Sequence, residues 1–78
     1  GYTIQVAALG SKATAEDLAK RLRRKGFASH ILPLSVPNRG TLYRVRIGGF
    51  NTLKEAEKWV GHLKQEEGLS PFIAKDKG

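Results

Sequence analysis

Apolar and more polar residues alternate in two stretches of the chain, residues 2–8 and residues 42–47. Successive side chains of a β-strand point to opposite faces of a sheet, so this alternation predicts a strand with one buried face. Both stretches are therefore expected to lie in a sheet, with their apolar sides turned to a common core. The apolar set is Tyr2, Ile4 and Val6 in the first stretch and Tyr43, Val45 and Ile47 in the second.

Between these stretches the apolar period changes to that of a helix. After Gly10, four apolar residues recur with the i, i+3, i+4, i+7 spacing of one helix face. Ser11 or Thr14 can cap the start of this helix, and Gly26 can end it because glycine readily adopts the left-handed conformation found there. The apolar stripe consists of Ala15, Leu18, Ala19 and Leu22.

A second helix is predicted after the second alternating stretch. Thr52 and Glu55 have the Thr-x-x-Glu spacing of a capping box, which marks a helix start. Before it, Gly48 and Gly49 are expected to let the backbone leave the sheet tightly, and Gly68 is expected to end the helix. Its apolar stripe consists of Ala56, Trp59, Val60 and Leu63.

Two further strands are predicted at residues 27–36 and 70–75. Pro33 favours an edge position for the first of them, because proline cannot donate a hydrogen bond within a central ladder. Residues 37–40, Pro-Asn-Arg-Gly, have turn chemistry, so this strand is expected to fold back as a hairpin onto the strand at residues 42–47.

The two halves of the chain repeat one pattern. Tyr43 follows Tyr2 by 41 residues, and the same offset aligns the two alternating stretches and the two apolar helix stripes. The predicted fold is α+β, with the order βαββαβ of the split-βαβ (ferredoxin- or RNP-like) class. We expect one domain over residues 1–78, built from half repeats at about 2–41 and 43–75, with an antiparallel sheet of strand order 4-1-3-2 and both helices on one face.

The formal net charge of +7 indicates an anionic partner, such as nucleic acid, a membrane surface or an anionic wall polymer. Five of the six residues from Lys20 to Lys25 are basic, at the end of the first predicted helix. Two interpretations of this run remain open. It can be a solvated helix end whose cations complement the helix dipole, or a separate patch that binds a partner.

The face of the sheet opposite the helices carries the candidate chemistry. Gln5 can donate and accept hydrogen bonds at once, Arg44 and Arg46 offer forked donors for carboxylates or phosphates, and Phe72 offers a plane for stacking. The alternative is that these are ordinary solvent-facing strand residues, or in the case of Phe72 a cap on the core edge. Strict alternation places on this face Thr3, Gln5, Ala7, His30, Leu32, Leu42, Arg44, Arg46, Phe72 and Ala74.

The composition argues against an enzyme. The chain has no cysteine, and its seven acidic residues fall on the predicted helices or in the tail rather than on a strand. Hydrolysis of a glycosidic bond generally needs two carboxylates that flank it, and the open face supplies none. His30 and His62 have no companion at metal-ligand spacing, and no phosphate-binding loop or Gly-x-Ser-x-Gly motif is present. We expect no catalytic residue, no metal and no cofactor.

Three groups of residues together resemble the SPOR (sporulation-related repeat) domain over nearly the whole chain. They are the doubled strand motif at residues 2–9 and 43–50, the helix positions Ala56 and Leu63, and the sequence Ser70-Pro71-Phe72. In this comparison Gln5 matches the family's glutamine on its first strand and Phe72 matches its aromatic on the fourth. The chain departs from the family at Ala8, where relatives can carry a hydroxyl residue, and at Leu42, where some have an aromatic.

The resemblance implies a non-catalytic module that binds septal peptidoglycan, with a preference for glycan strands lacking stem peptides, and that targets its parent protein to the division site. It also implies a location in the bacterial envelope, facing the periplasm or the wall. We expect a monomer without membrane contact of its own, excised from the C-terminus of a larger envelope protein. The alternative is an RNP-like domain that binds single-stranded nucleic acid, although no aromatic occupies the central-strand positions where such domains stack bases. The expected glycan-binding residues are Gln5, Ala8, His30, Leu42, Arg44, Arg46 and Phe72.

Overall fold

The structure is a computed structural model that describes residues 1–66 and 69–75. The predicted βαββαβ order is confirmed. Its elements are β1 (Tyr2–Leu9), α1 (Lys12–Arg24), β2 (Ser29–Val36), β3 (Gly40–Phe50), α2 (Leu53–Leu63) and β4 (Phe72–Lys75).

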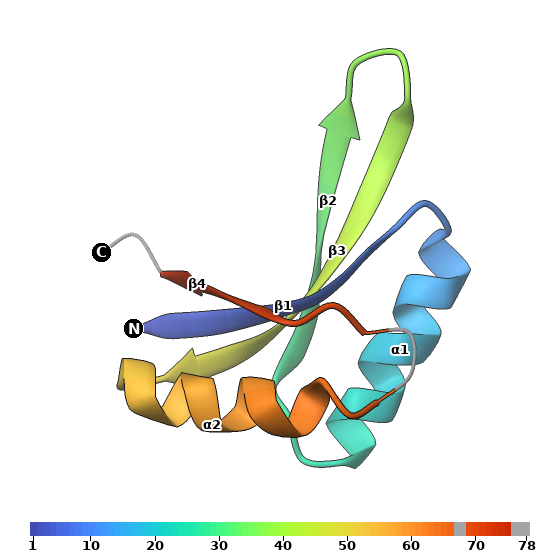
Figure 1. Cartoon of the computed structure of the whole chain (residues 1–78). Helices are drawn as coiled ribbons and strands as arrows, with labels where there is room; N and C mark the ends of the chain where they lie inside the picture. Colours follow the sequence, from blue (N-terminus) through green and yellow to red (C-terminus); the bar gives the residue numbers. More distant parts are fainter. Residues whose placement is uncertain (67–68, 76–78) are drawn as a thin grey trace.

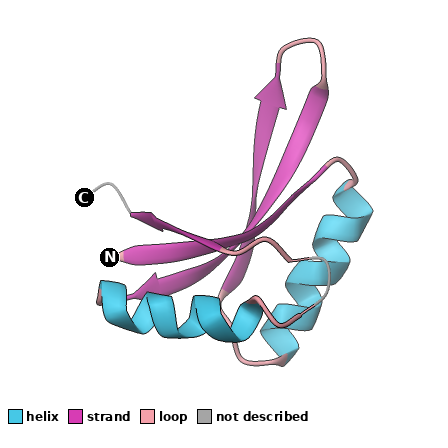
Figure 2. Ribbon diagram, viewed as in Figure 1, coloured by secondary structure: helices cyan, strands magenta, loops and turns pink. Residues whose placement is uncertain are grey.

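The four strands form one antiparallel sheet in the order β2-β3-β1-β4, which confirms the predicted order 4-1-3-2. The edge position predicted for the strand that contains Pro33 is also confirmed. Figure 1 shows the hairpin of β2 and β3 extending away from the two helices, and Figure 2 shows the helices gathered on one side of the strands. Among the strands, α1 packs mostly against β2 and β3, whereas α2 packs mostly against β1 and β4.

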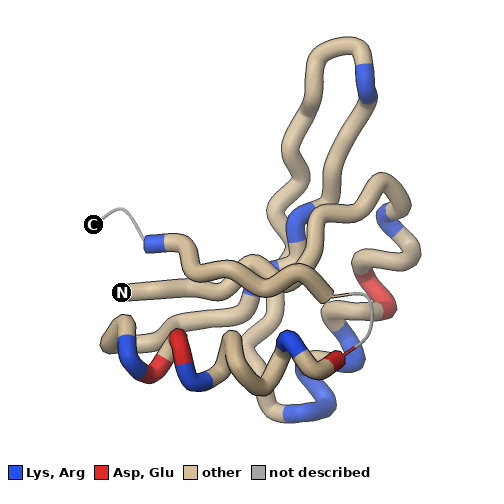
Figure 3. Tube along the Cα trace, in the orientation of Figure 1, with Lys and Arg blue, Asp and Glu red and all other residues tan. Residues whose placement is uncertain are grey.

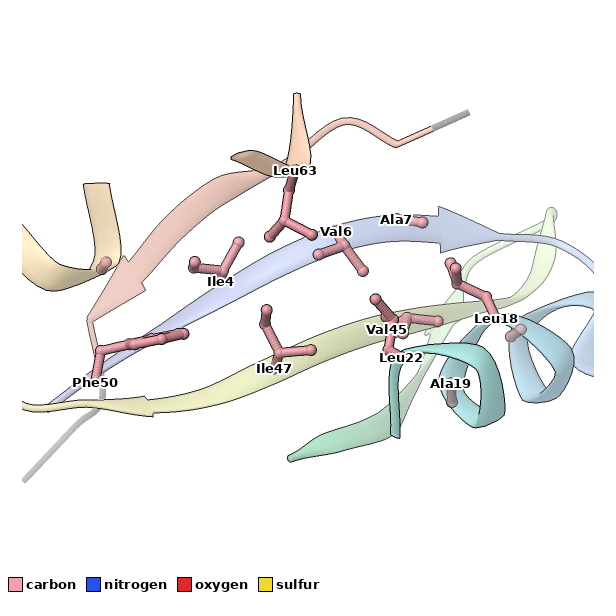
Figure 4. Packing of buried hydrophobic residues seen from close by; sticks show 12 residues of the cluster. Ile4, Val6, Ala7, Leu18, Ala19, Leu22, Val45, Ile47, Phe50 and Leu63 are labelled. Atoms are coloured by element: carbon pink, nitrogen blue, oxygen red, sulfur yellow. The ribbon is translucent and has the colours of Figure 1, made fainter. Parts of the chain in front are cut away.

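The core lies between the sheet and the helices (Figure 4). The apolar positions of the two alternating stretches meet there, and Ile4, Val6, Val45 and Ile47 are completely buried. Burying an aliphatic side chain of this size contributes about 1.5–3 kcal/mol, so these central strands supply much of the stability of a small domain. The helices close the core with Ala15, Leu18, Ala19, Leu22, Ala56 and Leu63.

Both helix starts are capped as the sequence indicates. Of the two candidate caps for α1, the structure uses Ser11, whose Oγ accepts a hydrogen bond from the Thr14 backbone N–H at 3.2 Å. Thr52 caps α2 in the same way, with Oγ1 3.1 Å from the Glu55 nitrogen. Neither α1 nor α2 combines the length and the apolar content that crossing a bilayer requires.

Several of the expected element ends are wrong: β3 extends beyond residues 42–47 at both ends, β4 begins at Phe72 rather than at residue 70, and β2 and α2 also differ. β2 begins at Ser29 rather than at residue 27, because the Phe27 N–H bonds back to the carbonyl of Leu22 and so completes the end of α1. Helix α2 ends at Leu63, five residues before Gly68, which lies outside the described residues.

The glycine pair does not let the chain leave the sheet, since β3 continues through it to Phe50. Thr3 pairs with Gly48, and Tyr2 pairs with Phe50. A Cβ atom at Gly48 would lie 2.6 Å from Thr3 Cγ2. Glycine at this position therefore allows close approach of the two central strands rather than a turn.

Candidate functional site

Four predicted site residues form a single row across the open face of the sheet, one from each strand. Gln5 of β1 pairs with Phe72 of β4 on one side and with Arg46 of β3 on the other, and Arg46 in turn pairs with His30 of β2. Neighbouring strands are about 4.8 Å apart, so the row Phe72–Gln5–Arg46–His30 extends over roughly 14 Å. The row combines a ring, an amide, a guanidinium and an imidazole in one strip.

The two central residues of the row are joined to each other. Arg46 Nε donates a hydrogen bond to Gln5 Oε1 at 3.1 Å. Gln5 is only 8% exposed, so the alternative that it is an ordinary solvent-facing strand residue is wrong. The bond fixes the plane of the Arg46 guanidinium and uses its Nε. Within the described part of the chain, neither Nη group of Arg46 makes a hydrogen bond, so the forked end of the side chain is free to bind a ligand.

A second arginine lies one position further along the same face. Arg44 is half-buried, and its Nε donates to the backbone carbonyl of Leu32 at 3.2 Å. Arg44 pairs with Ala8 of β1 and with Leu32 of β2. The small side chain of Ala8 is exposed and leaves the space beside Arg44 open.

A bulge in β1 decides which alanine reaches the open face. The pairing passes from Gln5 opposite Arg46 to Ala7 opposite Val45, so β1 has one residue more than β3 at this point. Ala7 is consequently buried in the core cluster, and the prediction that it lies on the open face is wrong. Strict alternation missed the bulge, whereas the family resemblance pointed to Ala8.

Exposed apolar groups lie at two places on the open face. Phe72 is 51% exposed on the edge strand β4. On the hairpin, Leu42 pairs with Leu34, and both are exposed. Leu34 was not among the predicted site residues, although it follows Leu32 by two positions on the same strand and alternation could have identified it.

The open face is electropositive. His30, Arg44 and Arg46 lie on it, and the described carboxylates lie on the two helices or just after α2. Figure 3 shows the acidic positions along the helices and basic positions near the centre of the sheet. No set of three histidine, cysteine or acidic side chains among the described residues is arranged to hold a metal ion. The described residues of this face offer a ring and several hydrogen-bond donors, and none of them is a carboxylate that could serve acid-base chemistry.

Residues 1–75 match the family model described as the SPOR domain. The chain belongs to the SPOR domain family. No curated protein sequence matches it. The match confirms the resemblance that the strand repeat and the Ser-Pro-Phe segment indicate, and it covers both half repeats of the sequence.

Two solved structures are similar to this SPOR domain. The SPOR domain of RlpA from Pseudomonas aeruginosa has a TM-score of 0.73 at 24% identity, over 97% of this chain and 100% of the other. The peptidoglycan-binding domain of the cell wall lytic enzyme CwlC from B. subtilis has a TM-score of 0.69 at 30% identity, over 97% of this chain and 89% of the other. The RlpA structure supports the fold, while the CwlC domain is a relative in both sequence and structure.

The basic run of α1 lies apart from the open face of this SPOR domain. Lys20, Arg21 and Arg24 line a shallow hollow that α1 forms with Leu9 and Leu69. All three cations are exposed on the helix surface. The structure therefore separates two basic regions that the net charge of the sequence could not distinguish.

Proposed function

We propose that this SPOR domain binds peptidoglycan through the open face of its sheet and prefers septal glycan strands that lack stem peptides. The family and the CwlC relative, which is described as a peptidoglycan-binding domain, support the ligand class. The observation that carries the proposal is the row Phe72–Gln5–Arg46–His30. A glycan strand is a flat chain with hydroxyl and acetamido groups, and the row offers it stacking at one end and hydrogen bonds along its length.

In this proposal each residue of the face has a distinct role. The exposed ring of Phe72 stacks on a sugar ring, and Leu42 with Leu34 extends the apolar contact on the hairpin. Gln5 holds Arg46 in place, so that the guanidinium and His30 can donate hydrogen bonds to the ligand. The small side chain of Ala8 leaves room for the glycan strand beside Arg44. The domain acts by binding alone, faces the cell wall as a monomer, and targets its parent protein to the division septum.

The direct test is a pull-down of the domain with purified sacculi, either untreated or stripped of stem peptides by an amidase. The domain is expected to bind the stripped sacculi several-fold better. Phe72→Ala should weaken this binding several-fold, and Leu53→Ala, which removes another exposed apolar side chain at the start of α2, should keep it. Weak and equal binding to both preparations would overturn the proposal.

The nucleic-acid alternative has no support from this face. Domains of that kind stack bases on aromatic side chains of the central strands, where this chain has Gln5, Arg44 and Arg46. A complex with short single-stranded RNA that survives about 0.2 M salt would be needed to revive it, since purely electrostatic binding weakens steeply with salt.

A further inference from the structure

We propose that Arg46 and Arg44 recognise the lactyl carboxylate that a glycan strand exposes once its stem peptide has been removed. In intact peptidoglycan this carboxyl group is held in an amide bond to the peptide. Hydrolysis by an amidase leaves a carboxylate on the sugar and an ammonium group on the released peptide. Stripping thus changes the charge of the strand as well as its bulk. The inference rests on the proposed function and adds the chemical feature that distinguishes the two kinds of strand.

The two guanidinium groups are held in position before any ligand binds. Arg46 Nε is bonded to Gln5 Oε1, and Arg44 Nε is bonded to the carbonyl of Leu32. In both cases Nε contacts the protein and the forked end makes no hydrogen bond within the described part of the chain. A guanidinium fixed in this way matches a carboxylate with two parallel hydrogen bonds and loses little conformational freedom on binding.

The charge of this pair is not compensated by the described residues. The one salt bridge among them joins Lys25 to Glu66, at the far end of α1. Arg44 and Arg46 are two residues apart on β3, which places their backbones about 6.7 Å apart, and His30 lies next to Arg46. Both arginines are half-buried, so water screens their repulsion less than it would screen two fully exposed side chains. A bound carboxylate would relieve this repulsion, whereas a neutral amide would not.

The position of the pair also fits a sugar that stacks on Phe72. Phe72 and Arg46 are two strand spacings apart in the same row, roughly 10 Å, with Gln5 between them. A glycan strand that lies along the row can stack one sugar ring on Phe72 and direct the acidic substituent of another sugar to Arg46. The aromatic ring then supplies affinity for any glycan, and the arginines supply the preference for stripped strands.

The experiment compares two soluble glycans of equal length. One is the stripped strand with free lactyl carboxylates, and the other is the same strand with those groups converted to neutral carboxamides. Isothermal titration of the domain should show at least tenfold tighter binding of the carboxylate form, and raising the salt from about 0.05 to 0.5 M should weaken only that form. This preference arises because hydrogen bonds to a charged partner are the stronger ones.

Two variants test the assignment to these side chains. Arg46→Gln keeps an amide donor but removes the charge, and it should reduce the preference for the carboxylate form to about twofold or less. Gln5→Glu is nearly isosteric and places a carboxylate against Arg46, so it should weaken binding of the carboxylate glycan more than it weakens binding of the carboxamide glycan. Arg24→Gln makes the same charge change on α1 and should keep the full preference. Chemical-shift spectra check that each variant is folded.

The outcomes separate this inference from the function on which it rests. Equal binding of the two glycans by the unmodified domain would overturn the inference while leaving glycan binding intact. An undiminished preference in both Arg46→Gln and a matching Arg44→Gln variant would overturn it as well. Failure to bind either glycan would overturn the proposed function and the inference together.

Discussion

The open face of the sheet and the basic end of α1 are both cationic, but the cations are held in different ways. On the sheet, Arg44 and Arg46 are half-buried, and each is tied through Nε to a protein acceptor. On the second half of α1, Lys20, Arg21 and Arg24 extend from an exposed helix surface. Long side chains that are free in solvent lose much rotamer entropy on binding, and their charge is screened. The denser charge is therefore on the helix, while the better-prepared binding groups are on the sheet.

Part of the basic run on α1 already has a structural role. Arg23 Nε donates to the backbone carbonyl of Ser29 at 3.1 Å, which joins the end of α1 to the start of β2. Lys25 pairs with Glu66 beyond the end of α2. Basic residues in the last turn also interact favourably with the negative end of the helix dipole. Folding alone thus accounts for much of this run, which favours the solvated-helix interpretation over a separate binding patch.

The substitution expected to have the largest effect is at Gly48, where the two central strands approach most closely, and it acts on the stability of the fold. Gly48→Ala would place a Cβ atom 2.6 Å from Thr3 Cγ2, and since Thr3 is a stiff β-branched residue on the adjacent central strand, its side chain or the pairing of the two strands must shift. We expect a loss of about 1–3 kcal/mol in the free energy of unfolding, measured by urea denaturation. Gly61→Ala is the control, because nothing lies within 4 Å of the added atom on α2. That variant should be neutral or slightly stabilising, and an equal loss in the two variants would contradict the strand-contact explanation.

The next effect concerns ligand affinity at the edge of the row. Phe72→Ala removes an exposed ring. An aromatic contact contributes about 0.5–1.5 kcal/mol to the binding free energy, so the dissociation constant for the stripped glycan should rise roughly three- to tenfold. Since the ring is half exposed, the free energy of unfolding should change little. Titration calorimetry gives the affinity and urea denaturation gives the stability. A large loss of stability without a loss of affinity would mean that Phe72 caps the core edge instead of contacting ligand.

A smaller change in stability should distinguish the roles of two neighbouring arginines of α1. Arg23→Ala removes the hydrogen bond to the Ser29 carbonyl and should cost about 1 kcal/mol in the free energy of unfolding. Arg24→Ala removes an exposed cation that makes no such bond within the described residues, and it should cost less than about 0.5 kcal/mol. Equal effects of the two substitutions would argue that the helix dipole, rather than the bond to Ser29, is what the basic run provides.

The sequence predicts the fold more completely than the site because the two depend on different signals. The buried positions of β1 and β3 follow from alternation, and those of α1 and α2 follow from helical spacing with their Ser11 and Thr52 caps. Each of these signals is local. The strand order also follows from them, once the half repeats are aligned and Pro33 is assigned to an edge.

The details of the site depend on contacts between strands, which no local pattern reports. The bulge after Gln5 turns Ala7 into the core and places Ala8 opposite Arg44. Likewise, the burial of Gln5 depends on the side chains of the adjacent strands, and its bond to Arg46 depends on their register. Strict alternation also tells to which face a side chain at position 48 would point, but it does not show how close Thr3 lies to Gly48. Residue types on a face can be predicted from sequence, but their mutual bonding requires the pairing of the strands.

The smallest expected effect is also the one that separates the two basic regions most directly. Charge reversal by the double substitution Arg21→Glu and Arg24→Glu changes the net charge by −4 but alters only exposed side chains beside the α1 hollow. At 0.15 M salt the screening length is about 8 Å, so these charges act weakly on the far side of the sheet. Affinity for the stripped glycan should stay within about twofold of the unmodified domain, as measured by titration calorimetry. A loss as large as that caused by Phe72→Ala would show that the ligand also contacts α1, and the two basic regions would then form one binding surface that extends around the edge of the sheet.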